Sequence, residues 1–93
     1  MVIGVAVWDL HLPGCSSLKE KRSILKSVKD RLHNQFNVSV AETARQDVHQ
    51  RAELTACVVS GDRAHANSVL DALDRFIEAE VRVRIIDSYT TYY

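Results

Sequence analysis

The chain has 93 residues, of which 46% are hydrophobic and 26% are charged, a composition typical of one small globular domain and not of a disordered chain. Twelve Lys and Arg residues balance twelve Asp and Glu residues, which excludes a strongly basic protein that binds nucleic acid by bulk charge alone. We therefore expect a single domain over residues 1–93, in which function depends on where the charges lie.

The first predicted element is a strand over residues 2–12, which begins apolar on both faces. It then alternates, with Trp8 and Leu10 on one side and Asp9 and His11 on the other. A strand that is apolar on both faces is typical of the centre of a sheet, with helices over one face and another surface over the other.

Three apolar residues of this strand have the parity opposite to that of Trp8 and Leu10: Ile3, Val5 and Val7. One of the two sets must point away from the helices. A second copy of the chain is the simplest cover for such a face, so we expect a homo-oligomer, most simply a dimer.

A long amphipathic helix is predicted over residues 17–36, after the turn at Pro13 and Gly14. Ser17 and Glu20 have the spacing of a capping box, in which each side chain bonds the backbone amide of the other. At about 100° per residue, the apolar residues fall in one wedge, with Ile24 at its edge; they are Leu18, Leu25, Val28, Leu32 and Phe36. Asn37 is expected to end the helix.

The same helix carries a basic stripe beside its apolar wedge. Segment 17–36 has six basic residues against Glu20 and Asp30. The stripe consists of Lys19, Arg22, Lys26, Lys29 and His33. Cations and free amides at a helix start together favour an anion, so the candidate anion-binding residues are Lys19, Lys21, Arg22, Lys26 and Lys29.

Lys21 falls within the apolar wedge and has two interpretations. Its stem could pack while the ammonium reaches water past the helix end, or the lysine could be held for a ligand or a buried carboxylate.

The remaining elements are a strand over residues 38–44, a strand over about 48–60, a helix with Asp62 as N-cap, and a strand over about 82–92. The order β-α-β-β-α-β predicts an α+β, ferredoxin-like sandwich: a four-stranded antiparallel sheet with two helices on one face.

Polar residues gather around the hairpin between the second and third strands. Glu42, His49 and Arg51, with Asp47 and Glu53, could line a polar pocket, or they could form cross-strand ion pairs that set the register. Asp9 and His11 could begin a metal site, but the sequence places no third ligand, so we expect neither a metal nor a cofactor.

No catalytic motif is found. Ser16 and Ser17 lie near lysines without any sign of an oxyanion site, and Ser17 is better explained as a cap. Cys15 and Cys57 lack metal-ligand spacing, and the apolar start is too short for a membrane span. A cytoplasmic protein with no membrane association and no enzymatic activity is expected.

Four motifs occur in order along the chain: HLPG at 11–14, SLKEKR at 17–22, NQFNVSVAE at 34–42 and QDVHQRAEL at 46–54. In these the sequence resembles the YlxP-like family of small bacterial proteins of unknown function. The resemblance covers nearly the whole chain and implies a ferredoxin-like fold. It also implies a link to translation, because genes of this family often lie beside genes for translation initiation and ribosome maturation.

We therefore expect a non-catalytic binding module that contacts RNA, such as ribosomal RNA, or another polyanion through the first helix. The alternative is a ligand-sensing homodimer with a small-molecule pocket at the hairpin or the subunit interface.

Overall fold

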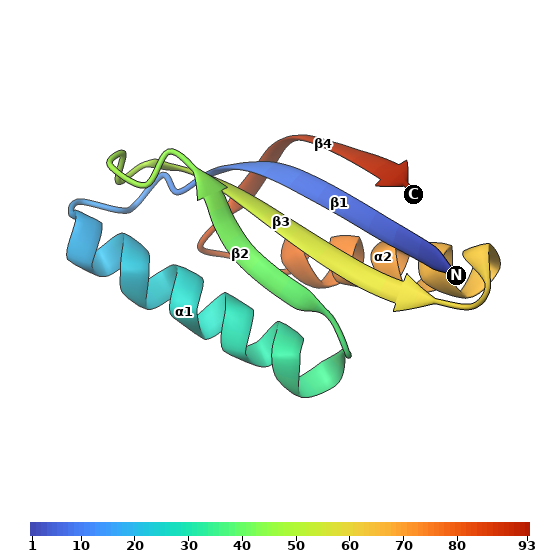
Figure 1. Cartoon of the computed structure of the whole chain (residues 1–93). Helices are drawn as coiled ribbons and strands as arrows, with labels where there is room; N and C mark the ends of the chain where they lie inside the picture. Colours follow the sequence, from blue (N-terminus) through green and yellow to red (C-terminus); the bar gives the residue numbers. More distant parts are fainter.

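The computed structural model describes residues 1–93 and has the element order β-α-β-β-α-β (Figure 1). The elements are β1 Val2–His11, α1 Leu18–Gln35, β2 Ser39–Ala44, β3 Arg51–Ser60, α2 Arg63–Glu78 and β4 Arg84–Tyr92. The strands form one sheet in the order β2-β3-β1-β4, and every neighbouring pair is antiparallel. Both helices cover the same face, which confirms the predicted ferredoxin-like sandwich.

Alternation along the central strands builds the core. Ala6, Trp8 and Leu10 of β1 point toward the helices and pair in register with small or branched residues of β3. They meet the apolar sides of both helices, where the most buried residues are Leu25, Val28, Leu32, Leu70, Leu73 and Ile77. Leu18 and Phe36, at the two ends of the predicted apolar wedge, are only partly buried, as are Val69 and Phe76 of α2.

Little room is left for a side chain at Gly4. A Cβ at this position would lie 3.0 Å from Leu70 Cδ1 and 3.2 Å from Val58 Cγ1. Both contacts are tighter than ordinary van der Waals contact, so with a side chain at this position the Leu70 and Val58 side chains would have to move by a few tenths of an ångström.

The caps agree with the sequence except in one bond. Ser17 Oγ accepts from the Glu20 amide at 3.1 Å, and Asp62 Oδ1 accepts from the Ala64 amide at 3.0 Å. Glu20 Oε2 does not return to the Ser17 amide but accepts from the amide and hydroxyl of Ser16, at 3.1 and 2.9 Å. The cap is therefore one residue wider than predicted.

Three element boundaries differ from the prediction. α1 ends at Gln35 with Phe36 as its C-cap, so Asn37 lies outside the helix. β3 begins at Arg51 and not at 48, because residues 45–50 form a loop that starts with Arg45 at a φ of 65°. β4 begins at Arg84 and not at 82, because Arg82 folds back onto Glu80.

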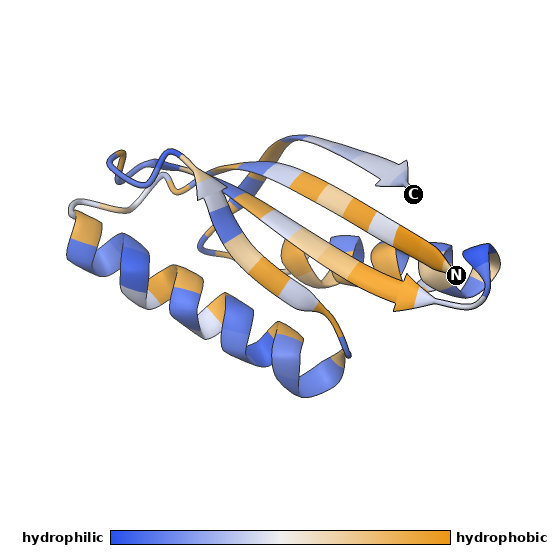
Figure 2. Cartoon of the chain, viewed as in Figure 1, coloured by the Kyte–Doolittle hydropathy of each residue, from blue (hydrophilic) through white to orange (hydrophobic).

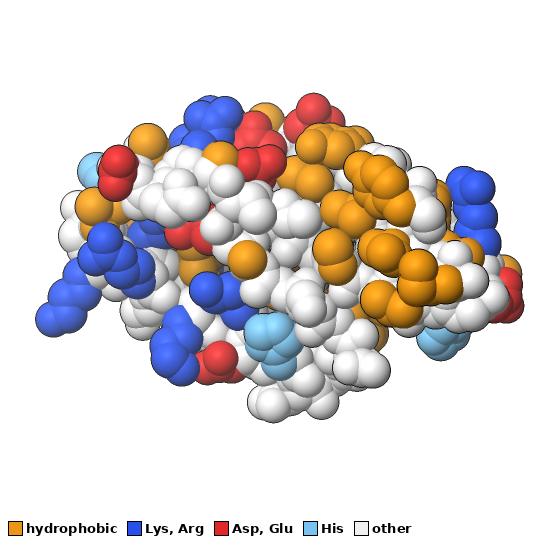
Figure 3. All heavy atoms as spheres, in the orientation of Figure 1, with side chains coloured by type: hydrophobic (Ala, Val, Ile, Leu, Met, Phe, Trp, Pro, Cys, Tyr) orange, Lys and Arg blue, Asp and Glu red, His pale blue; other side chains and the backbone are white.

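The sheet has an open face, the one turned away from the helices. Ile3, Val5 and Val7 point to this face, as one of the two alternatives for β1 requires. Figure 2 shows the hydrophobic stretches of β1 and β3 side by side, and Figure 3 shows hydrophobic side chains gathered at one end of this face. No helix has the length and hydropathy needed to cross a membrane.

Candidate functional site

The outer flank of α1 carries a row of basic residues, which we call the basic flank: Lys19, Arg22, Lys26, Lys29 and His33. Lys29 is half-buried, and the other four are exposed. The opposite flank of α1 faces α2, because Arg31 packs over the Phe76 ring at 5.1 Å. The basic flank therefore lies on the side away from α2, next to the edge strand β2. Figure 3 shows Lys, Arg and His side chains along α1 on this side of the molecule.

Most of the charge on the basic flank is unpaired. Lys26 Nζ lies 2.7 Å from Asp30 Oδ2, one turn on. This hydrogen-bonded pair raises the pKa of Lys26 and lowers the pKa of Asp30. Lys19, Arg22 and Lys29 make no ion pair. Because the Lys26–Asp30 pair is largely exposed, water already competes for it and an incoming anion can do the same.

Lys21 is not part of an external anion site. Its side chain is 1% exposed, and its ammonium lies 2.6 Å from Glu42 Oε2. It also donates to the carbonyl oxygens of Arg45 and Val48, at 2.6 and 2.7 Å. The two carbonyl oxygens accept hydrogen bonds, while the contact with Glu42 is an ion pair without hydrogen-bond geometry. Of the two interpretations of Lys21, the structure supports the second in part: the Glu42 carboxylate, whose side chain is 16% exposed, holds the ammonium, so Lys21 presents no exposed charge to an external anion and leaves the set of anion-binding candidates.

The polar residues of the β2–β3 hairpin do not form one cluster. Glu42 points to the helix side of the sheet, where it pairs with Lys21. Arg51 points to the open face, where its Nη2 lies 2.7 Å from Asp9 Oδ2. His49 is half-buried in the loop, near enough to Glu20 for its charge to contribute a little to the lowered pKa of that carboxyl, which the bonds from Ser16 chiefly cause.

A cavity of about 310 Å³ lies on the open face beside this hairpin. It is lined by Val7, Asp9, Ala44, Arg45, Glu53, Asp87 and Tyr89. Asp9 stands directly opposite Glu53 on one neighbouring strand and Asp87 on the other. Arg51 and Arg45, the latter 3.6 Å away, both pair with Asp9. No three His, Cys, Asp or Glu side chains are grouped to hold a metal ion.

No pattern in the sequence indicates that Asp9 and Asp87 line the same cavity. A bulge between Asp9 and Leu10 shifts the register of β4, and strand spacing alone does not indicate a bulge. The ion pair of Asp9 with Arg51 is also diagonal, because the residue directly opposite Arg51 is His11.

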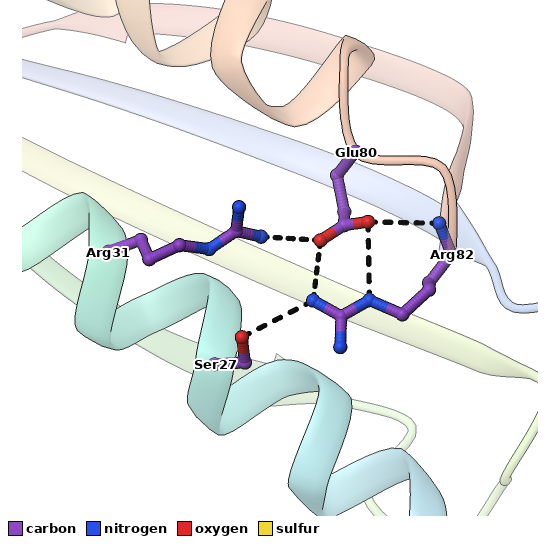
Figure 4. Close-up of polar contacts among 4 residues, drawn as sticks. All are labelled: Ser27, Arg31, Glu80 and Arg82. Carbon is purple, nitrogen blue, oxygen red and sulfur yellow. Dashed lines mark hydrogen bonds and ion pairs between the residues drawn. The ribbon is translucent and has the colours of Figure 1, made fainter.

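Another basic residue of α1, Arg31, forms an ion pair with the buried carboxylate of Glu80. Glu80 follows α2, its side chain is 6% exposed, and both Arg31 and Arg82 contact it (Figure 4). Arg82 donates to the Glu80 carboxylate from Nη2 at 2.6 Å and from its backbone amide at 3.0 Å. These bonds, together with the bond from Arg31, lower the pKa of Glu80 to about 2. Arg82 also donates to the Ser27 hydroxyl at 3.2 Å, so this network ties α1 to the α2–β4 loop.

This network predicts acid sensitivity. In the unfolded chain Glu80 titrates near 4.5, and in the folded chain near 2. Above pH 4.5 the Glu80 network contributes its full stabilisation to the folded state. As the pH falls toward 2, the unfolded state binds a proton that the folded state does not, and the free energy of unfolding decreases. We expect a loss of roughly 1–2 kcal/mol over this window, reduced because both arginines are partly in water. Urea unfolding at stepwise pH should show a shallower dependence for Glu80→Gln than for Glu78→Gln.

Comparison with known proteins gives a family and a fold. A family model described as "Protein of unknown function (DUF503)" matches residues 3–90. The uncharacterized protein YlxP of Bacillus subtilis (strain 168) is 36% identical over 78 residues, which cover 84% of this chain and 85% of that protein. A de novo designed protein with a ferredoxin fold superposes with a TM-score of 0.51 at 19% identity, covering 100% of this chain and 83% of the designed one.

Proposed function

The chain belongs to the DUF503 family of proteins of unknown function, and on that premise we propose that it is a non-catalytic binding module that holds single-stranded RNA through the basic flank of α1. Membership agrees with the YlxP-like resemblance of its motifs. The family itself assigns no activity, so the proposal depends on the chemistry of the flank.

The observation that carries the proposal is the division of the basic residues of α1. Lys21 and Arg31 form ion pairs with Glu42 and Glu80 of the same chain. Lys19, Arg22 and Lys29 are left unpaired on the basic flank. Since the fold supplies carboxylates for some cations of this helix and not for these, an external polyanion is a suitable partner for them.

The spacing of the flank suits a nucleic-acid backbone. From Lys19 to Lys29 the helix rises about 15 Å, enough for roughly three phosphates of a single strand. An exposed ammonium or guanidinium contacts phosphate without reading the base, so binding should tolerate many sequences. The resemblance to a family linked with translation makes ribosomal RNA in the cytoplasm the RNA that we propose.

We expect the double variant Lys26→Glu/Lys29→Glu to lose most of its affinity for single-stranded RNA. Three neutralised phosphates give a slope near −2 in a plot of log affinity against log salt, or a roughly 15-fold fall between 50 and 200 mM salt. The variant should bind more weakly on every sequence and show a slope near zero. Fluorescence anisotropy with labelled oligonucleotides at several salt concentrations measures both quantities.

The matched control is Arg75→Glu/Arg84→Glu, which makes the same change in net charge on exposed residues outside the flank. It should keep the slope of the wild type. Equal RNA retention by wild type and the flank variant at low salt would reject the proposal. Capture from a bacterial lysate, with and without nuclease, then shows whether the retained RNA is ribosomal.

One observation favours a second function, the binding of a small molecule at the open face. The cavity beside Asp9 has the size of a ligand pocket and carries side chains of both charge signs. A thermal-shift screen separates the two functions, because a ligand of the native state raises the melting temperature. A shift with a metabolite that Asp87→Asn abolishes would support the pocket, and a shift with RNA alone would support the flank.

A further inference from the structure

We propose that a second copy of this chain packs on the open face of the sheet, open face to open face, with the two-fold axis parallel to the strands. The proposal is independent of RNA binding, because it uses the face of the sheet turned away from α1. Three observations support it: the apolar end of the open face, the area of that face, and the position of the Asp87 carboxylate, which has no ion pair within its own chain.

One end of the open face is apolar and largely exposed. Ile3 and Val5 of β1 lie beside Val59 and Cys57 of β3 in register. Val59 is 67% exposed, and Tyr93, whose backbone pairs with that of Ile3, is 75% exposed. Figure 3 shows hydrophobic side chains gathered at this end of the molecule. Soluble monomers rarely leave a central apolar strand pair open to water in this way.

The face is large enough for a stable dimer. Strands of ten, ten, nine and six residues, at about 3.4 Å per residue and about 4.8 Å apart, give roughly 570 Å² before the contribution of protruding side chains is added. A standard interface buries about 800 Å² on each partner. A second sheet at the usual spacing of about 10 Å therefore covers the whole face.

The distribution of charge fixes the orientation of the second copy. The end of the face opposite the apolar one holds Asp9, Arg51, Glu53 and Asp87. A two-fold axis perpendicular to the strands would place this charged end on the apolar end of the partner, which buries charges without partners. An axis parallel to the strands places the apolar ends on each other and the charged ends on each other.

This orientation brings one pair of opposite charges together at each edge of the interface, and at its centre it sets Asp9 over Glu53 of the partner subunit, with the Arg51 guanidinium beside Asp9 as the nearest cation. It reverses the strand order, so that β4 of one copy lies over β2 of the other. Asp87, Asp9, Glu53 and Ala44 stand at one level across the sheet, and Arg45 directly follows Ala44. Asp87 has no ion pair within its own chain, and it comes opposite Arg45 of the partner subunit, twice by symmetry. The partner also closes the cavity that these residues line.

The first experiment compares two exposed valines. Val59 lies on the open face and Val81, 91% exposed, lies in the α2–β4 loop on the far side. Multi-angle light scattering at micromolar concentration should give the dimer mass for wild type and Val81→Glu and the monomer mass for Val59→Glu, with unchanged circular dichroism for all three. A monomeric wild type, or a Val59→Glu variant that remains a dimer, would overturn the proposal.

A thiol probe checks the face directly. Cys15 is buried and Cys57 lies half-buried on the open face, so a maleimide reports on Cys57. Its reaction should be at least about tenfold faster in Val59→Glu than in wild type. Equal rates would mean that no partner covers this face, and the proposal would fail.

The second experiment tests the orientation by charge exchange. Asp87→Arg and Arg45→Asp should each raise the dimer dissociation constant by about tenfold or more, because each places like charges opposite each other twice. The double variant Asp87→Arg/Arg45→Asp should return it to near the wild-type value. A double variant as weak as the single ones would overturn the axis parallel to the strands.

Discussion

Lys21→Met should lower the free energy of unfolding by about 3–5 kcal/mol, the cost of breaking a buried ion pair by removing one partner. Methionine fills nearly the same volume, so the loss comes from the Glu42 carboxylate and from the carbonyl groups of Arg45 and Val48, which lose their donor. Urea unfolding followed by circular dichroism measures the effect.

The control for this prediction is Lys19→Met, the same substitution on the exposed flank of the same helix, which should change stability by less than half a kcal/mol. A second variant, Lys21→Met/Glu42→Gln, removes both charges. It should recover part of the loss, because the remaining amide needs less compensation than a carboxylate. Equal stability of Lys21→Met and Lys19→Met would show that the Lys21 ammonium is solvated.

The second large effect is expected in the core. Leu73 of α2 is 0% exposed, and Leu73→Ala should cost about 2–5 kcal/mol through lost burial and the cavity left behind. The midpoint of urea unfolding should fall while the slope of the transition stays the same.

Val81→Ala is the matched control for Leu73→Ala, because Val81 is almost fully exposed and its side chain packs against little. Its stability should be close to that of the wild type. A loss below half a kcal/mol for Leu73→Ala would mean that α2 presents a different side to the sheet.

The fold was predictable from the sequence because each element carries a local signal. Ser17 and Asp62 mark the two helix starts, and the apolar periodicity of the helices selects the sides that face the core. The two apolar faces of β1 place it at the centre of the sheet without showing which face meets the helices. The order of elements then leaves few topologies. The boundaries of β3 and β4 were less accurate, because Arg45 and Arg82 are drawn into turns by contacts with residues distant from their own strands.

The candidate site was predictable only in part. The row of the basic flank follows from helical spacing, which is local. The ion-pair partners of Lys21 and Arg31 could not be predicted from helical spacing, because Glu42 and Glu80 approach them only once the sheet and the second helix are in place. For the same reason the sequence does not indicate that Asp74 of α2 accepts a hydrogen bond from Trp8 Nε1 of β1, at 2.9 Å. Charge counted along a sequence thus overstates what remains free on the surface.

The contacts of the Lys21 ammonium with Glu42, Arg45 and Val48, which we call the clamp, also constrain the order in which the chain can fold. An ammonium leaves water without penalty only when all its acceptors are assembled, and these acceptors come from β2 and from the loop after it. A hairpin formed before α1 docks, or a helix docked before the loop closes, gains nothing from the clamp. The first helix and the hairpin should therefore order and melt as one cooperative unit, and partly folded forms that contain just one of them should stay sparsely populated.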